Sequence, residues 1–385
     1  MTNQKDLQDF KGSERDEWES VRLGDVAEII LGQSPKSEFY NEEGNGPHFL
    51  QGAKNFGNRY PKLERYCSEP KREAKKGDVL ISVRAPPGPV NIAPENVCIG
   101  RGVTAIRANK GPNKYLYYYL KFYKPRWESV AGGTTFKSIN KSDLQSLEIP
   151  YPPLATRKRI SNFLSIFDEK IETNQRLSIK LHNLAASIYK DMFVDFSPYS
   201  ETVAANGDEI PASFEMGTLG DILSLEYGEG LSADKREGDK YPVYGSNGTT
   251  GRHNEFLVEG PGVIVGRKGV NFGSVKFSQE NFWPIDTSFY VSGKSFDHPT
   301  YFYHLLNNMN FQHLGSDSAV PGLNRNVAHD QPVPIPPESE VSKFASRVAP
   351  MHKQRNHIEN ENRKLKQLRD SLNRAIMTRE IHLPE

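Results

Sequence analysis

The sequence predicts an α+β protein with a pseudo-twofold internal repeat, built from two mixed α/β domains that are each followed by a long helix. Two observations predict this fold class. Short motifs from the first half of the chain recur in the same order in the second half, and each copy ends in a heptad pattern of apolar residues. A repeat offset of 184 to 196 residues indicates a duplicated domain, because a solenoid needs three or more short repeats.

Length and composition limit the class of protein. A chain of 385 residues is too long for one ordinary domain, and 36% hydrophobic with 10% aromatic residues is enough to form real cores. The 49 basic and 48 acidic residues nearly cancel, which excludes a uniformly basic, histone-like binder but not local basic patches. Two cysteines cannot build a disulfide framework or a four-ligand zinc site. The polar start and the lack of long apolar runs predict a cytoplasmic protein with no membrane partner.

Three motifs align the two copies. The offset between the copies is 196 for the first motif and 184 for the other two, so the second copy is about a dozen residues shorter inside its globular part. The aligned motifs are Leu23-Gly24-Asp25 with Leu219-Gly220-Asp221, Ile139-Asn140 with Leu323-Asn324, and Ile149-Pro150-Tyr151-Pro152-Pro153 with Val333-Pro334-Ile335-Pro336-Pro337.

Each copy shows the same order of predicted elements. Short apolar runs bounded by Gly and Pro predict strands, most clearly at 77–84 and 262–267. The tyrosine-rich segments at 115–120 and 301–306 have the length and spacing of helices. A proline-rich stop then ends each globular part, because proline fixes φ and lacks a backbone N–H donor.

A heptad seam follows each proline-rich stop. Ten positions spaced alternately four and three, from Ile160 to Met192, carry eight apolar residues, and the same frame from Phe344 to Ile376 carries seven. Such a span makes a rod of roughly 48 Å. We expect the two rods to pair with each other, the alternatives being that each packs on its own domain or on another protein. The seam residues expected to carry helix pairing and partner binding are Ile160, Leu164, Phe167, Ile171, Leu181, Ile188, Val348, Ile358, Leu365 and Leu372.

Polar seam residues should fix the helix register at some cost in stability. They are Asn174, Ser178, Arg355 and Asn362, whereas apolar residues outside the seam, such as Leu177 and Leu184, could serve a second partner. These signals divide the chain into a flexible N-terminus (1–17), a first globular domain (18–154), a central long helix (155–196), a linker (197–211), a second globular domain (212–338) and a C-terminal long helix (339–385).

The sequence carries no recognisable catalytic motif. Gly293-Lys294-Ser295 imitates the end of a phosphate-binding loop, but Ser288 stands where the leading glycine should be, so we expect a strand end. Gly260-Pro261-Gly262 precedes a strand and does not join a strand to a helix. The sequence has no glycine-rich adenosylmethionine loop, no Asn-Pro-Pro-aromatic motif and no histidine spacing typical of metal ligands. We therefore predict a non-catalytic chain that holds no cofactor or metal.

Charge is distributed unevenly, and a few patches point to DNA. Residues 1–154 carry a net +4, whereas residues 197–338 carry 9 basic and 18 acidic residues, a net −9. Cations, hydroxyls and amides in Gly-rich loops fit phosphate contacts, and Arg and Asn are the usual readers of guanine and adenine. Each such residue also fits a solvated surface, but the set favours DNA. The candidates are Lys54, Asn55, Arg59, Arg84, Thr134 and Lys137 in the first copy, and Asn247, Arg252, Arg267, Lys268 and Arg325 in the second.

The order of these features resembles the specificity subunit of type I restriction–modification systems. The resemblance covers roughly residues 18–380 and rests on the duplicated Leu-Gly-Asp openings, the Gly-Asp-Val-Leu-Ile-Ser-Val-Arg run from Gly77, the duplicated proline motifs and the helices after them. The second copy departs from this pattern with Gly-Val-Ile-Val-Gly-Arg from Gly262 and with Glu338 in place of Leu154. These departures make residue transfer between the domains uncertain.

The resemblance implies two target-recognition domains, each reading half of a bipartite site in double-stranded DNA, held apart by two long helices in an antiparallel coiled coil. Because the two domains differ in sequence and charge, we expect an asymmetric site. It also implies two modification (methyltransferase) subunits docked on the helices, with restriction and translocase subunits in the full complex. S-adenosylmethionine, ATP and Mg²⁺ would then be bound by those partner subunits, and none by this chain.

Two other functions fit the sequence less well. One is a coiled-coil protein-interaction scaffold without DNA binding, which the acidic second domain favours. The other is an autonomous DNA-binding regulator, but the sequence shows no helix-turn-helix or zinc finger, and its net charge is low for unaided binding. Salt-dependent DNA binding that requires a methylating partner would separate the three.

Overall fold

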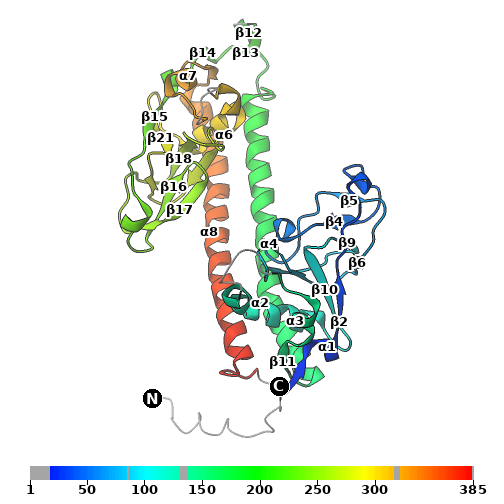
Figure 1. Ribbon diagram of the computed structural model, residues 1–385. Helices are drawn as coiled ribbons and strands as arrows, with labels where there is room; N and C mark the ends of the chain where they lie inside the picture. The colour runs from blue at the N-terminus through cyan, green and yellow to red at the C-terminus, as the bar shows by residue number, and fades with distance from the viewer. Residues whose placement is uncertain (1–17, 85, 131–137, 206, 316–320, 384–385) are drawn as a thin grey trace, which may run out of the picture. The chain divides into compact units, whose positions relative to one another are not determined.

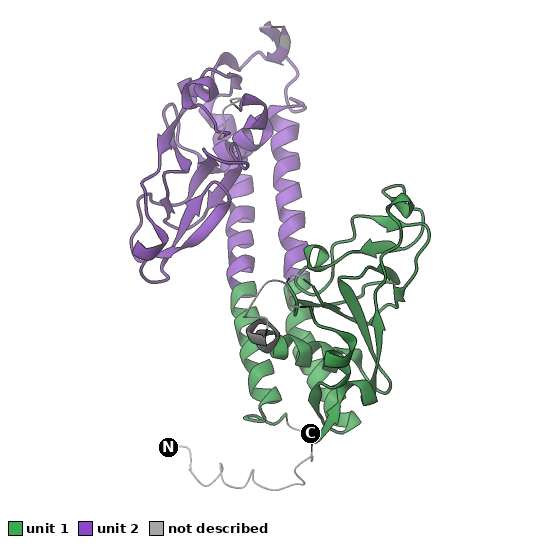
Figure 2. Ribbon diagram, in the orientation of Figure 1, with its two compact units in different colours: residues 1–172, 362–385 green, residues 173–361 purple. Residues whose placement is uncertain are grey.

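The computed structural model describes residues 18–84, 86–130, 138–205, 207–315 and 321–383 (Figure 1). The chain folds as two compact units (Figure 2). Unit 1 comprises Met1–Glu172 and Asn362–Glu385, and unit 2 comprises Thr173–Glu361. Each unit therefore contains one copy of the globular repeat together with adjoining parts of both long helices.

The two units repeat one sheet topology, which confirms the duplication predicted from the sequence. Each has a four-stranded antiparallel sheet, in the order β2-β10-β7-β8 in unit 1 and β15-β21-β18-β19 in unit 2. The strands are β2 (Ala27–Leu31), β10 (Val103–Ala108), β7 (Val79–Ser82) and β8 (Val90–Ile92), then β15 (Leu223–Tyr227), β21 (Ser288–Gly293), β18 (Gly262–Gly266) and β19 (Val275–Ser278). The strands expected at 77–84 and 262–267, and the strand end at Gly293, are confirmed.

The copies differ in their second sheet. Unit 1 has five short strands in the order β3-β5-β4-β9-β6, and unit 2 has three in the order β17-β16-β20 together with a separate β12–β13 hairpin. The bounds in unit 1 are β3 (Tyr40–Asn41), β4 (His48–Leu50), β5 (Tyr66–Cys67), β6 (Glu73–Ala74) and β9 (Val97–Ile99). Those in unit 2 are β12 (Thr202–Ala205), β13 (Asp208–Pro211), β16 (Tyr241–Gly245), β17 (Gly248–His253) and β20 (Trp283–Pro284). The residues missing from the second copy are thus lost before β18.

The proline-rich segments expected to be simple stops are strands. They form β11 (Glu148–Tyr151), which pairs with β1 (Glu19–Arg22), and β22 (Pro332–Ile335), which pairs with β14 (Glu215–Thr218). A two-stranded ladder has only edge strands, where a proline can face away from the partner without losing a ladder hydrogen bond. The next two prolines then lead directly into a long helix in both copies.

Short helices explain the other repeated motifs. The Leu-Gly-Asp openings form one-turn helices α1 (Leu23–Val26) and α5 (Leu219–Ile222). The repeated asparagines are N-caps: Asn140 accepts a backbone hydrogen bond at the start of α3 (Lys141–Gln145), and Asn324 does so at the start of α7 (Arg325–His329). These asparagines are therefore repeated for a structural reason.

The tyrosine-rich segments are the central core helices, α2 (Asn113–Val130) and α6 (Pro299–Met309), as predicted. Each belongs to a core that also contains the four-stranded sheet and both long helices. In unit 1 this core includes Val79, Ile106, Tyr115, Tyr118, Leu164 and Ile376, and in unit 2 it includes Val265, Phe289, Tyr189, Tyr301, Phe302 and Phe344. Tyrosine suits this place because it supplies both bulk and a hydroxyl that can reach a polar partner.

The long helices are α4 (Leu154–Phe193) and α8 (Glu338–Met377), and they pair in each unit. In unit 1, Asp168 of α4 contacts Arg369 of α8, while Leu164 shares a core with Ile376. In unit 2 the Asn174 amide donates to Glu361 at 2.7 Å. All ten predicted seam positions of each helix are buried or half-buried, which confirms the seam and its antiparallel pairing. The helices end at Phe193 and Met377, short of the predicted 196 and 385.

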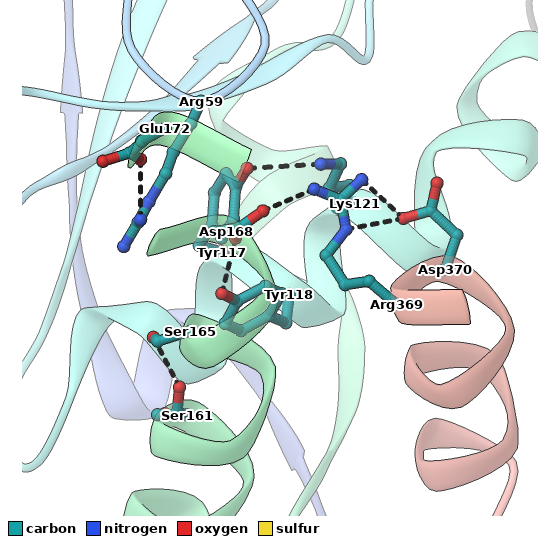
Figure 3. Close-up of polar contacts among 10 residues, drawn as sticks. All are labelled: Arg59, Tyr117, Tyr118, Lys121, Ser161, Ser165, Asp168, Glu172, Arg369 and Asp370. Carbon is teal, nitrogen blue, oxygen red and sulfur yellow. Dashed lines mark hydrogen bonds and ion pairs between the residues drawn. The ribbon is translucent and has the colours of Figure 1, made fainter. Parts of the chain in front are cut away.

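A buried polar cluster joins three elements of unit 1 (Figure 3). Asp168, 3% exposed, makes an ion pair with Arg369, 9% exposed, and also accepts a 2.6 Å hydrogen bond from the Tyr118 hydroxyl of α2. Arg59 reaches α4 from the first globular domain and donates to Glu172 at 2.7 Å. These contacts fix the position of α2 and of the Arg59 loop against the helix pair.

Lys121 of α2 lies beside the same cluster and donates to the Tyr117 hydroxyl at 3.3 Å (Figure 3). Burial and the neighbouring Arg369 guanidinium lower the pKa of Lys121 to about 8. The Asp168 carboxylate acts in the opposite direction and raises the pKa of Lys121. It therefore stabilises the charged forms of both Lys121 and Arg369.

Arg369→Met should destabilise unit 1 by about 3–5 kcal/mol, because it leaves the Asp168 carboxylate buried without its partner. Urea unfolding of the full chain measures this loss. The double variant Asp168→Leu, Arg369→Met should recover most of it, and Arg374→Met, at an exposed position of α8, should change little. A single variant as stable as the wild type would contradict a structural role for the ion pair.

A buried histidine pair makes unit 2 sensitive to acid. His304 of α6 and His352 of α8 place their Nε2 atoms 3.1 Å apart. Burial, with nearby cationic groups, lowers the pKa of His304 to about 3 and that of His352 to about 4. Both rings are therefore neutral in the folded unit at neutral pH.

The stability of unit 2 should fall as the pH drops from about 6.5 towards 4, because the unfolded chain takes up protons that the folded pair does not bind. At pH 5 the loss is about 2 kcal/mol for each histidine. Urea unfolding at pH 7.5 and 5.0 measures it. The double variant His304→Gln, His352→Gln should flatten this dependence, while His357→Gln, exposed on α8, should not. An unchanged slope in the double variant would refute the assignment.

Candidate nucleic-acid interface

An exposed tyrosine flanked by two arginines stands out on unit 2. Tyr227, the last residue of β15, is 46% exposed. The Arg267 guanidinium lies 4.6 Å from the centre of its ring, and the Arg325 guanidinium lies 5.1 Å from it. Each contact is a cation–π interaction, and together they hold two guanidinium groups around one ring at the surface.

The backbone brings these residues together from distant parts of the chain. Arg267 follows β18, and its carbonyl accepts from the Leu323 N–H at 2.9 Å, just before α7 and Arg325. The Arg267 N–H donates to the Thr287 carbonyl at 2.9 Å, and its guanidinium donates to the Asp286 carbonyl at 3.1 Å. Two loops and a strand end therefore position the cluster through main-chain hydrogen bonds.

Hydrogen-bonding capacity remains free on these cations. The buried Nε of Arg325 has no hydrogen-bond partner among the described residues, because the guanidinium rests on the Tyr227 ring. Lys268 is exposed, and its amine lies 3.8 Å from the Asp286 carboxylate. Three cations, Arg267, Lys268 and Arg325, thus lie together in a globular part that is net acidic, and Lys268 is the one that approaches a carboxylate. Guanidinium groups held in this way can donate to phosphates or to the edges of bases.

The predicted candidate Asn247 lies next to this cluster. It is exposed in the turn between β16 and β17 and accepts from the Asn271 amide at 2.6 Å. The neighbouring Ser246 hydroxyl accepts from the Lys268 N–H at 3.3 Å. Four predicted residues, Asn247, Arg267, Lys268 and Arg325, are therefore brought together on one part of unit 2.

Arg252 serves the fold instead. It donates to the backbone carbonyls of Asp239 and Lys240 and pairs with Glu280 at 3.1 Å. Its guanidinium is held by the protein itself, so Arg252 contributes to the fold, and its role in DNA binding stays a prediction.

Two candidates of the first copy are likewise structural. Asn55 is 6% exposed, and its side-chain oxygen accepts from the Gln51 N–H at 3.0 Å. Arg59 is 7% exposed and paired with Glu172. Both were expected on a DNA-facing loop, but their hydrogen-bonding groups are buried and occupied, which corrects that expectation.

Of the four remaining candidates in the first copy, two are exposed and two are not described. Lys54 and Arg84 are exposed. Thr134 and Lys137 fall outside the described residues. Tyr227 with Arg267 and Arg325 forms what we call the Arg–Tyr–Arg cluster. Among the described residues of unit 1, no aromatic ring has two guanidinium groups beside it, and the strand register explains the difference.

The ladders align the two copies residue by residue. Ile81 of β7 pairs with Thr104, which pairs with Leu31, and Val265 of β18 pairs with Phe289, which pairs with Tyr227. Counting on from these pairs gives the equivalences Leu31 with Tyr227, Val83 with Arg267, Arg84 with Lys268 and Lys141 with Arg325. The position of Arg84 and of Arg267 at the end of each apolar run suggested that they are equivalent. The strand register shows that they are not, because Arg84 aligns with Lys268, one residue after Arg267.

The helices expose a second kind of surface. On α4, Leu177 and Leu184 are 42% and 50% exposed and lie one heptad apart, so they share a face beside the seam. Leu181 lies in the seam and is half-buried. The apolar residues predicted to serve a second partner at 177 and 184 are therefore accessible within unit 2.

The described ranges contain no cluster of three or more His, Cys, Asp or Glu side chains suited to a metal ion. Within the same ranges, no helix has the length and apolarity needed to cross a membrane.

Comparison with known proteins yields a family match and several relatives. The family model for the type I restriction modification DNA specificity domain matches residues 15–183 and 211–368. The type I restriction enzyme MjaIX specificity subunit of Methanocaldococcus jannaschii is 25% identical over 96% of this chain and 94% of its own length. The candidate MjaX specificity subunit of the same organism is 46% identical, but over 43% of this chain and 41% of that protein.

One solved structure shares the fold across most of the chain. The S subunit of a type I restriction–modification system from M. genitalium has a TM-score of 0.62 at 20% identity, covering 94% of this chain and 97% of that one. This likeness supports the two-copy architecture with two long helices.

Proposed function

The chain belongs to the family of type I restriction modification DNA specificity domains, and on that premise we propose how its two copies divide the recognition of DNA. The family assigns it to sequence-specific DNA recognition within a restriction–modification complex. Each unit reads one half of a bipartite site in double-stranded DNA, and the two halves differ in sequence.

The observation that carries this proposal is the difference between equivalent positions. Unit 2 has Arg267 and Tyr227 where unit 1 has Val83 and Leu31. Val83 is 5% exposed and packs in the core, so it offers nothing to a base edge, whereas Arg267 offers a preorganised guanidinium. Two surfaces of different chemistry on one scaffold are what an asymmetric target requires.

Chemistry belongs to partner subunits in this proposal. The chain supplies recognition, while modification subunits bind S-adenosylmethionine and methylate a base, and restriction and translocase subunits use ATP and Mg²⁺. Methylation requires the target base to leave the stack, which needs a pocket shaped for that base. In this proposal the protein acts in the cytoplasm, the compartment that holds the DNA it recognises.

The long helices fix the spacer between the half-sites and dock the modification subunits. Their seam is buried or half-buried along its full length, which makes each helix pair a stiff element. Leu177 and Leu184 offer an apolar stripe for a partner helix or sheet. A scaffold that does not bind DNA is disfavoured by the family match itself.

Arg267→Ala should weaken recognition of one half-site, because it removes a guanidinium held at the surface of unit 2. A lost base contact costs about 1–3 kcal/mol, or about 5- to 150-fold in affinity. Single-molecule methylation sequencing of host DNA, with the gene intact and deleted, first identifies the motif. Binding of the methyltransferase complex to oligonucleotides altered in one half then reports the loss.

Arg347→Ala, at an exposed position of α8, serves as the control and should leave both halves unaffected. Arg84→Ala should act on the other half. Equal weakening of both halves by Arg267→Ala would make that residue a phosphate contact or a structural residue. An unchanged methylome after deletion of the gene would contradict the proposed function.

Leu184→Asp should abolish copurification with the modification subunit, because it places a charge in the middle of the apolar stripe. The seam is untouched, so circular dichroism and thermal unfolding should remain as in the wild type. Ile179→Asp, which is equally exposed but on another face of α4, is the matched control and should assemble normally. Leu181→Asp is less informative, because Leu181 lies in the seam. A complex of Leu184→Asp at full yield would exclude this docking face.

A further inference from the structure

A polar groove on unit 2 lies between the β16–β17 hairpin and α8. Its volume is about 380 Å³, and the side chains that line it include Tyr244, Thr249, Lys276, Gln279, Arg355 and Glu359. Lys276 and Arg355 carry positive charge, and Glu359 is the one carboxylate on its walls. The groove is therefore lined by donors with a net positive charge.

The two cations of the groove have no ion-pair partner among the described residues. Arg355 approaches only neutral groups, the Ser178 hydroxyl at 3.5 Å and the His182 ring at 3.4 Å. Burial and the Arg355 charge lower the pKa of His182, so that ring does not compete for an anion as a second cation at neutral pH. Lys276 is exposed. Unlike Arg252, both remain available to an anionic ligand.

One turn of the chain touches both the groove and the Arg–Tyr–Arg cluster. The turn Ser246-Asn247-Gly248 joins them: the Ser246 hydroxyl accepts from the Lys268 N–H on one side. On the other side, the position that a Cβ would occupy at Gly248 is 3.6 Å from Cε of Lys276. Four of the nine basic residues between 197 and 338 lie along this path, namely Arg267, Lys268, Lys276 and Arg325. A globular part with net −9 thus places four of its nine basic residues along one strip, which Arg355 extends onto α8.

We propose that this groove binds the phosphodiester backbone of DNA, so that the strand read by the Arg–Tyr–Arg cluster continues across the β16–β17 turn to α8. This inference rests on the proposed function and extends it, because it makes a long helix part of the DNA interface. Lys276 and Arg355 contact phosphates and do not read bases, since phosphate contacts need only a cation within reach of the backbone. Glu359 opposes them and moderates the affinity.

The test measures DNA binding by the full chain in its methyltransferase complex as a function of salt. Arg355→Gln and Lys276→Gln should each lower the slope of log K against log salt by about 1 and weaken cognate and scrambled DNA equally. Glu359→Gln should do the opposite and tighten binding to both, because it removes a repulsion. A gain in affinity cannot arise from misfolding, so the Glu359→Gln variant distinguishes an effect of the groove charge from a loss of folded protein.

Arg347→Gln is the matched control, since it removes the same charge from an exposed position of α8 about two turns before Arg355, outside the groove lining, and should not change the slope. If the wild type binds its motif but all three groove variants keep the wild-type slope and affinity, the groove assignment is overturned. A change in sequence preference at Arg355→Gln would also overturn it, since that is the mark of base readout. If the wild-type complex binds no motif, the proposed function fails instead.

Discussion

The pairing of α4 with α8 is the constraint on which the rest of the structure depends. The main core of each globular copy includes these helices: Leu164 and Ile376 complete that of unit 1, and Tyr189 and Phe344 that of unit 2. Unit 1 also has a smaller core without the long helices, which contains Leu50, Leu80 and Val103. The tyrosine helices lie in the same cores as the sheets and the helix pair. Each recognition surface is therefore oriented by its packing on the two helices.

Polar groups in the helix pair set its register. A seam of apolar residues alone would tolerate sliding by a heptad, whereas a buried charge must meet its partner. Asp168 meets Arg369 in unit 1, and Asn174 meets Glu361 in unit 2. Because Asp168 also binds Tyr118, and Glu172 one turn further along α4 binds Arg59, the register of the helices and the placement of the first globular domain are fixed by the same side chains. The buried ion pair therefore specifies the register of the helices, which an apolar pair at the same place would not do.

The sequence allowed the periodic parts of the fold to be predicted, and the reasons are local. Heptad spacing, β-branched runs and tyrosine-rich helices depend on neighbours within a few residues. The proline motifs were misread as simple stops because their pairing partner, β1 or β14, lies more than a hundred residues earlier. Two of the predicted cations, Arg59 and Arg252, have ion-pair partners that their own sequence neighbourhoods do not reveal. Residue type identifies Arg59 as a candidate, but only the fold shows that Glu172 occupies it. Tyr227 left no signal, because an exposed tyrosine at a strand end looks ordinary until two guanidinium groups are seen beside it.

Comparison of the two copies separates residues that build the scaffold from residues that recognise DNA. Positions that repeat have structural roles: Asn140 and Asn324 cap helices, and a Cβ at Gly32 or Gly228 would come within 2.4 Å of a backbone oxygen. Positions that differ, such as Leu31 and Tyr227, occupy equivalent places in the two sheets but have different roles. A surface position that differs between the copies, while its neighbours keep their structural roles, is not required for the fold. Recognition residues in the first copy should therefore be sought at the equivalents of the Arg–Tyr–Arg cluster and around them, where exposed Arg84 and Lys141 stand, and not among its buried cations.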